Sequence, residues 1–362
     1  MTYPIANEIN PPKTPPQEIR ITCPKQHVGH RLLSGCLAML LILFGVLFVF
    51  CIVMFFGVIV ALRGTADSVT EINEKTFSGN KNANDKIAVI TLDGIIYGGE
   101  ETGFIKQIAK ATDDHNVKAV VLRIDSPGGT VSGSDYYHHK LLEFKTKRKI
   151  PIVVSMGNMA TSGGYYLAVT GDEIFAEHST ITGSIGVIMP NYDLSELCDK
   201  IGVKSDPIVS GPLKQLGSVT RKLTDDERAV LDSVISDMFS RFKEIVCDGR
   251  PALRNDPKLL AEVTTGQIFL AKQALDKQLI DRIGYLEDAV ERAAVLAGLP
   301  SDGYHAVRYK QPKTVLETMI GIKADRIPGA DSQVAVATEL LNDIAAPKMY
   351  YIYPRALPVR EQ

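Results

Sequence analysis

Apolar, β-branched runs alternate with helical stretches through the middle of the chain. The runs cover residues 87–96, 119–124 and 152–156 and predict strands. Residues 131–147 predict a helix, and a second helix is expected to open near Ser162. Because strands and helices alternate, we expect an α/β fold with a largely parallel core sheet.

The second half of the chain predicts more helices. Thr224 and Glu227 form a capping-box pattern at the start of one of them. Shorter helices are expected at 257–263, 270–279 and 286–297, where Gly298 and Pro300 end the last. Beyond residue 300 the pattern weakens, with a helix expected at 333–345 and an aromatic segment at Tyr350, Tyr351 and Tyr353. No internal repeat is visible.

An uncharged apolar run precedes this domain. Residues 32–62 are 31 positions without a charge, about 46 Å long as a helix against a hydrocarbon core of roughly 30 Å. The run is too long for a signal peptide and lacks a small-residue cleavage site, so we expect a retained transmembrane anchor. The preceding tail is the more basic flank, which predicts a cytoplasmic N-terminus and an extracytoplasmic catalytic domain in the cell membrane.

The predicted organisation follows from these patterns. Residues 1–31 are proline-rich and read as a disordered cytoplasmic tail, and 63–85 are polar and read as a linker. The folded domain is expected at 86–300, followed by a C-terminal extension of unclear role at 301–362.

Composition narrows the possible functions. The 40 Lys and Arg nearly balance the 42 Asp and Glu, and tryptophan is absent, so neither a polyanion partner nor nucleic acid is indicated. Cys198 and Cys247 are the cysteines that remain for the external domain. A single bridge between them is possible, and two separate buried thiols are the other reading. No metal or nucleotide motif occurs, so no cofactor is expected.

Ser162 is the candidate nucleophile. It follows the strand at 152–156 and opens a helix, where unpaired backbone N–H groups can stabilise an oxyanion. Gly163 and Gly164 would let a substrate backbone approach closely. The alternative is that Ser-Gly-Gly merely caps a helix.

A serine nucleophile needs a base. The histidines are expected in the tail, on polar helix or loop surface, or in turns: His27, His30, His115, His138, His139, His178 and His305. A lysine can serve where burial lowers the pKa of its ammonium from about 10.4 towards neutrality. Lys214 lies in a Gly- and Pro-bounded segment with apolar neighbours that could exclude water. Taken alone, it could equally be an ordinary surface lysine.

Four segments together resemble the signal peptide peptidase A family. Residues 157–166, Gly-Asn-Met-Ala-Thr-Ser-Gly-Gly-Tyr-Tyr, are similar to its nucleophile motif, and Lys214, 52 residues after Ser162, matches its base. Asp-Ser-Pro-Gly-Gly at 125–129 resembles its strand-end turn, and Thr-Gly-Ser-Ile-Gly at 182–186 a further segment. The resemblance covers roughly residues 86 to 300; Thr161 departs from it, because many relatives have alanine there.

The resemblance implies roles for individual residues. Gly129 N–H would donate to the oxyanion, with Gly163 N–H as second donor, and the hydroxyls of Thr182 and Ser184 would orient the amine of Lys214. It implies a fold like Clp protease and crotonase, in the short single-repeat form that assembles as a homo-oligomeric ring, an octamer. Ser and Lys of one site would come from neighbouring protomers.

The expected activity is a membrane-anchored serine endopeptidase that degrades cleaved signal peptides and other apolar extended peptides. Two other readings are a crotonase-type acyl-CoA enzyme, because that fold uses backbone oxyanion donors in the same place, and a non-catalytic ring-forming membrane scaffold. The Ser-Gly-Gly turn and the anchor count against the first, and the presence of both Ser162 and Lys214 against the second.

Overall fold

The computed structural model describes residues 72–100, 102–310 and 349–352, with isolated helical positions at 45, 48, 52 and 54. The chain divides into two units, Met1–Ala66 and Asp67–Gln362. The predicted anchor at 32–62, apart from those four positions, and the predicted helix at 333–345 lie outside the described residues. Within the part that is described, no helix is both long and apolar enough to cross a bilayer.

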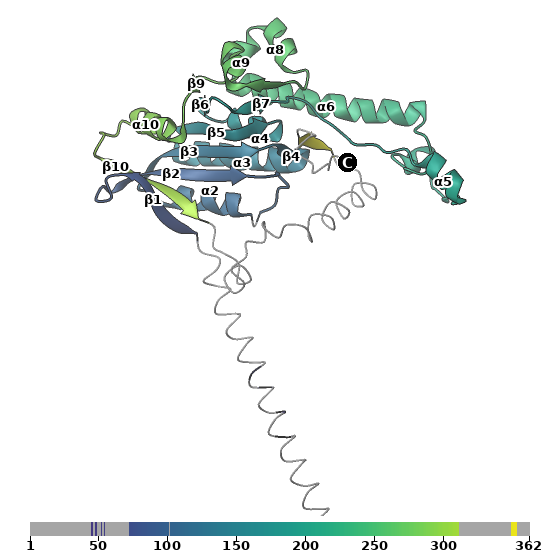
Figure 1. The fold of residues 1–362 in the computed structure, drawn as a ribbon, viewed down its shortest axis with the longest axis horizontal. Helices are drawn as coiled ribbons and strands as arrows, with labels where there is room; N and C mark the ends of the chain where they lie inside the picture. The colour runs from purple at the N-terminus through teal and green to yellow at the C-terminus, as the bar shows by residue number, and fades with distance from the viewer. Residues whose placement is uncertain are drawn as a thin grey trace, which may run out of the picture. The chain divides into compact units, whose positions relative to one another are not determined.

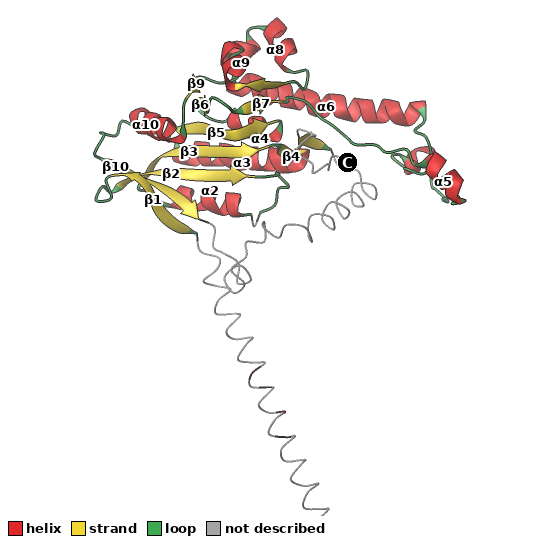
Figure 2. Ribbon diagram, viewed as in Figure 1, coloured by secondary structure: helices red, strands yellow, loops and turns green. Residues whose placement is uncertain are grey.

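A nine-stranded mixed sheet forms the centre of the second unit (Figures 1 and 2). Its main path runs β1-β10-β2-β3-β5-β6-β9, and every pair from β10 to β9 is parallel. The strands are β1 (Asn73–Gly79), β2 (Asp85–Asp93), β3 (Val117–Ser126), β5 (Ile152–Thr161), β6 (Glu173–Ala176), β7 (Ile181–Gly183), β8 (Ile268–Leu270), β9 (Arg282–Ile283) and β10 (Tyr304–Lys310). The predicted α/β fold with a largely parallel core sheet is confirmed.

Two cores lie on the two faces of this sheet. Alternate strand residues point to opposite faces, so Ala88, Val120 and Val154 join one core, and Ile87, Val121 and Val153 join the other. The first core packs against α2 (Gly103–Asp113), α3 (Val131–Arg148), α4 (Gly163–Ala168) and α6 (Asp225–Gly249). The second packs against α10 (Leu286–Leu296). Burial on both faces explains why the central strands are continuous apolar runs.

An arm extends from the body of this unit (Figure 1). It carries α5 (Ser195–Ile201), the 3₁₀ turn η1 (Pro212–Gln215) and the start of α6. Val219 accepts a 2.7 Å hydrogen bond from Leu194, which joins the α5 and η1 parts. Large apolar side chains of the arm are exposed: Leu197, Ile201, Val203, Ile208, Val209 and Leu213. The remaining helices are α7 (Pro251–Arg254), α8 (Pro257–Val263) and α9 (Ala271–Asp276).

The sheet extends at one side by two strands that lie outside the predicted domain. β1 lies inside the predicted linker at 63–85, and β10 lies inside the predicted extension at 301–362. β10 inserts between β1 and β2, antiparallel to β1 and parallel to β2. β1 is polar because it is an edge strand with much of its surface in solvent. The sheet therefore extends beyond the expected domain bounds of 86 and 300, from Asn73 at the start of β1 to Lys310 at the end of β10.

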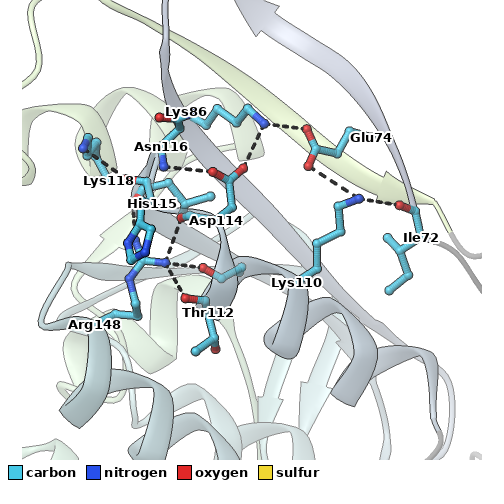
Figure 3. A network of polar contacts seen from close by, with 12 residues as sticks. Ile72, Glu74, Lys86, Lys110, Thr112, Asp114, His115, Asn116, Lys118 and Arg148 are labelled. Atoms are coloured by element: carbon cyan, nitrogen blue, oxygen red, sulfur yellow. Dashed lines mark hydrogen bonds and ion pairs between the residues drawn. The ribbon is translucent and has the colours of Figure 1, made fainter.

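Figure 3 shows the polar network that holds this edge. Lys86 Nζ bridges Glu74 Oε2 of β1 and Asp114 Oδ2, both at 2.8 Å. Arg148, at the end of α3, donates to the carbonyls of Ala111, Thr112, Asp114 and Val117 at 2.6–2.9 Å. These contacts fasten the end of α2 to the neighbouring helix and strand.

Cys198 and Cys247 are separate free thiols, each half-buried. This agrees with the second of the two readings of the sequence. Burial raises the pKa of the Cys247 thiol.

Candidate active site

Ser162 lies at the sharp turn between β5 and α4. Its backbone has φ 53° and ψ −114°, a conformation that a non-glycine residue adopts at a cost. Two hydrogen bonds hold it: Ser162 N–H donates to Gly183 O at 2.7 Å, and Tyr166 N–H donates to Ser162 O at 2.8 Å. The side chain is 1% exposed and accepts no capping bond from α4. The simple helix-cap interpretation of this serine is therefore wrong.

Gly163 is tightly enclosed. A Cβ at this position would stand 2.4 Å from Ser134 Oγ and 3.1 Å from Tyr351 O. Ser134 is fully buried, and its hydroxyl has no hydrogen-bond partner among the described residues. Gly163 N also lies 2.7 Å from where a Cβ on Gly128 would stand. The backbone N–H of Gly163, which follows Ser162, is thus adjacent to the turn at Gly128.

Gly129 belongs to β4 (Gly128–Thr130), which meets residue 96 on one side and β11 (Tyr350–Ile352) on the other. Gly128 O accepts from Ile96 N–H at 2.9 Å, and Thr130 N–H donates to Ile96 O at 2.8 Å. Because backbone groups alternate in direction along a strand, the N–H of the intervening Gly129 faces β11.

β11 lies between β4 and Ile188 as an added strand, and we call the position that it fills the candidate groove. It pairs antiparallel with β4, with Tyr351 opposite Gly129. On its other side, Tyr350 exchanges two backbone hydrogen bonds with Ile188, at 2.9 and 3.0 Å. The Tyr351 carbonyl therefore faces Gly129. Its oxygen lies 2.0 Å from where a Cβ on Gly128 would stand, so it is close to the Gly163 nitrogen as well.

Lys214 lies apart from this turn. It belongs to η1 on the arm, and its side chain is exposed. Its Nζ has no hydrogen-bond or ion-pair partner among the described residues. The water-excluding surroundings that we expected for this lysine are therefore not supplied by its own chain.

Thr182 and Ser184 flank Gly183, whose carbonyl accepts the hydrogen bond from the Ser162 N–H. Thr182 is buried in β7, and its hydroxyl donates to Ala160 O at 2.7 Å. Ser184 is also buried, has φ 52°, and donates its N–H to Gln267 O at 2.8 Å. Within the described contacts, neither hydroxyl meets Lys214.

The burial of His138 contradicts one prediction from the sequence. It was expected on polar surface, yet it is 6% exposed and packs edge-on against Tyr166, with ring centroids 5.2 Å apart. Burial lowers the pKa of His138 to about 4. The sequence of α3 hides this, because Tyr166 reaches His138 from another element. No described hydrogen bond joins His138 to Ser162, so its burial does not make it the base.

The sequence pattern did not assign Ser134, Phe242 or Tyr351 to the candidate site, and it included Tyr166 only as the last residue of the segment 157–166. The aromatic segment around Tyr351 was visible in the sequence. Tyr351 is 189 positions from Ser162 along the chain, so its position beside Ser162 could be known only from the fold.

Comparison with known proteins identifies the family. Residues 144–300 match the model described as peptidase family S49, a range that includes Ser162 and Lys214. A Synechocystis sp. protein named "Putative protease slr0021" is 37% identical over 71% of this chain and 87% of its own length. "Putative signal peptide peptidase SppA" of Enterococcus faecium is 34% identical over 61% of this chain and 66% of the relative.

"Protease 4" of Salmonella typhi is 35% identical over 65% of this chain, which spans 38% of that longer protein. With these relatives and the matching family model, the chain belongs to peptidase family S49 and is a serine protease of the signal peptide peptidase A family.

Proposed function

We propose that this chain is a membrane-anchored endopeptidase that cleaves extended, apolar peptides through Ser162 and Lys214. One observation carries the proposal: the chain's own β11 lies in the groove, with the Tyr351 carbonyl facing Gly129 and close to the Gly163 nitrogen. Strand addition of this kind is a common way to bind an extended peptide, because main-chain hydrogen bonds give affinity for many sequences. β11 occupies the place of a substrate.

In the proposed reaction the Ser162 hydroxyl attacks the peptide carbonyl whose oxygen lies where Tyr351 O lies. The N–H groups of Gly129 and Gly163 stabilise the developing oxyanion. The unprotonated amine of Lys214 accepts the serine proton and returns it to the leaving amine. Water then hydrolyses the acyl-serine ester. The strained turn at Ser162 supports this role, because strain of this kind concentrates at active sites.

We propose that Lys214 reaches Ser162 of a neighbouring protomer. Its exposed position on the arm supports this, as do the exposed apolar side chains around η1, which a second copy would cover. The assembly would be the homo-oligomeric ring, an octamer, that the family resemblance implies. Thr182 and Ser184, both near Ser162, would then meet the incoming lysine.

The proposed location is the cell membrane, with residues 32–62 as anchor, a cytoplasmic N-terminus and the catalytic domain outside. Cleaved signal peptides are the proposed substrates, since they are apolar and released at the membrane. The name of the Enterococcus faecium relative, a signal peptide peptidase, supports this choice.

Subunit mixing tests the proposed shared site. Ser162→Ala and Lys214→Ala should each be inactive as purified full-length protein. Dissociated and reassembled together, they should recover about a quarter of wild-type peptide hydrolysis, because random neighbours unite an intact serine and an intact lysine at that frequency. If each variant is inactive and the mixture stays inactive while wild type survives the same treatment, the shared site is wrong. Acyl-CoA turnover without peptide cleavage would favour the crotonase reading instead.

A further inference from the structure

An open apolar cleft of about 760 Å³ lies between α2 and α3, and we call it the helix cleft. Ile105 and Ile108 of α2 and Leu142 of α3 line it, and the Leu142 side chain is 43% exposed. Its rim on α3 is polar, where Glu143 contacts both His139 and Lys140, at 3.2 and 2.8 Å. An apolar floor with a polar rim is the kind of surface that receives the apolar face of a helix.

The two helices that form the helix cleft run in the same direction, on the same side of the sheet (Figure 1). Near their N-termini, Tyr137 of α3 donates its hydroxyl to Thr102, the N-cap of α2, at 2.9 Å. Near their C-termini, Arg148 of α3 donates to the carbonyls of Ala111 and Thr112, at 2.6 and 2.9 Å. The helix cleft therefore has one end at the N-termini and one at the C-termini of both helices.

Residues 311–348 lie outside the described residues, but the structure fixes where they leave the sheet. Lys310, the last residue of β10, pairs with Asn73 of β1. The carbonyl of the preceding Ile72 accepts a 2.7 Å hydrogen bond from Lys110, in the last turn of α2. The segment therefore departs beside the C-terminal end of the helix cleft.

The segment returns at the other end of the helix cleft. The carbonyl of Met349 accepts a 3.1 Å hydrogen bond from the N–H of Val131, the first residue of α3. The four residues from 345 to Met349 span at most about 14 Å, and the eight helical residues from Val131 to His139 rise about 12 Å. Residue 345 can therefore reach the cleft at His139. A helix at 333–345, about 20 Å long, would then extend along the cleft to its C-terminal end.

The sequence gives the predicted helix at 333–345 an apolar face that fits this cleft. Residues at spacings of three and four share one side of a helix. The apolar residues at these spacings are Val334, Ala337, Leu341 and Ile344. Glu339 and Asp343 fall on the opposite side of such a helix, where they would remain in solvent.

We propose that the helix cleft is the docking site of the chain's own residues 333–345, which lie in it as a helix antiparallel to α3. The two ends of the segment carry the proposal, because they meet the chain at the two ends of the cleft. Docking buries the exposed side of Leu142 against the apolar face of the helix. The inference goes beyond the proposed peptidase activity and does not depend on it.

Disulfide trapping in the full-length chain tests the docking. The chain carries Ser162→Ala, so that the segment stays intact whether or not the enzyme can cleave it. Leu142→Cys is combined with Leu341→Cys on the apolar face or, as the matched control, with Asp343→Cys on the opposite face. After mild oxidation, mass spectrometry of tryptic peptides should find the first pair linked at least about tenfold more than the control pair, because a disulfide needs closely placed Cβ atoms. Equal yields for the two pairs would overturn the docking.

Two further measurements identify the occupant of the cleft without using catalysis. In a reassembled mixture of isotope-labelled and unlabelled protein, the link should join residues of the same chain; links only between labelled and unlabelled chains would overturn docking of the chain's own segment. In the chain without added cysteines, Leu142→Asp should speed amide hydrogen exchange across 333–345 about tenfold, because it removes the apolar contact. Val295→Asp, at an exposed position of α10, should leave that exchange unchanged. Equal exchange in both variants and the parent chain would overturn the proposal.

Discussion

Arg221 clamps the carboxylate of Glu227 and, with the same guanidinium, holds the segment that carries Lys214. Its Nη1 donates to Glu227 Oε2 at 2.8 Å, and its Nη2 bonds the other carboxylate oxygen. Its Nε donates to Gln215 Oε1 at 3.0 Å and its Nη2 to Gln215 O at 3.2 Å. Gln215 follows Lys214 directly, so Arg221 ties η1 to the first turn of α6.

Replacing Arg221 should therefore move Lys214 out of position. We expect Arg221→Lys to lower kcat about tenfold with a smaller change in KM, because a lysine cannot reproduce the planar fork. The exposed pair of Arg254 with Asp248 offers the matched control, and Arg254→Lys should leave kcat unchanged. Equal kcat for both variants and wild type would show that the clamp does not position Lys214.

The ion pair between Arg221 and Glu227 also predicts that stability depends on pH. The hydrogen bond from Arg221, followed by that from the Thr224 N–H, lowers the pKa of Glu227 to about 2 from an ordinary value near 4.5. The folded pKa is the lower one, so the stabilisation is fully present above pH 4.5 and is lost as pH falls towards 2. Urea unfolding measured from pH 6 to pH 2 should show that the free energy of unfolding falls more steeply for wild type than for Glu227→Gln. Parallel curves would contradict the assignment.

The close approach of Gly163 to the Ser134 hydroxyl can be tested by changing each residue alone and both together. Gly163→Ala should abolish activity, because its Cβ would stand 2.4 Å from Ser134 Oγ. Ser134→Ala alone should be nearly neutral in stability, because the hydroxyl it removes is buried and has no hydrogen-bond partner in the described part of the chain. The double variant should recover part of the activity, measured as kcat/KM on the peptide Lys-Met-Tyr-Tyr-Ile-Tyr. No recovery would mean that the contact with Ser134 is not what excludes a side chain at Gly163.

Arg148 should matter for stability and not for chemistry. Arg148→Met removes the donors for four backbone carbonyls at the end of α2, and we expect it to lower the free energy of unfolding by about 2–4 kcal/mol. Arg254→Met should change it by less than about 0.5 kcal/mol. Urea denaturation measures both; similar values for the two variants would show that the carbonyls find other donors.

Sequence alone predicted the parts of this fold that are locally encoded. The central strands were found because both their faces are buried, which makes them continuous apolar runs, as at residues 119–124. The capping box of Thr224 and Glu227 was predicted, and both of its hydrogen bonds are present. β1 was missed because an edge strand keeps a polar surface. β10, which lies inside the sheet, was missed because His305 and Arg308 interrupt its apolar residues. The other missed strands, β4, β6, β7, β8, β9 and β11, have two to four residues, too few to form a pattern.

The site could be predicted only in part for a related reason. Ser162 was proposed from its place between a strand and a helix, while Lys214 was proposed from its Gly- and Pro-bounded segment with apolar neighbours together with the family resemblance. The side chain of Tyr351 contacts Tyr166, Phe242 and Met238. All three are distant from it in sequence, and only Tyr166 lies in a segment that the sequence singled out. The exposure of Lys214 depends on what a neighbouring copy covers, which no pattern within one chain encodes.

Hydrolysis of the peptide Lys-Met-Tyr-Tyr-Ile-Tyr by the full-length protein, wild type beside Ser162→Ala, tests the central claim most directly. The full chain is needed, because a cut at residue 86 would remove β1 from the sheet. We predict hydrolysis by wild type and a loss of at least about 1,000-fold in the variant, since the nucleophile carries the covalent step. Equal hydrolysis by the two proteins, or none by an oligomeric wild type, would contradict the account.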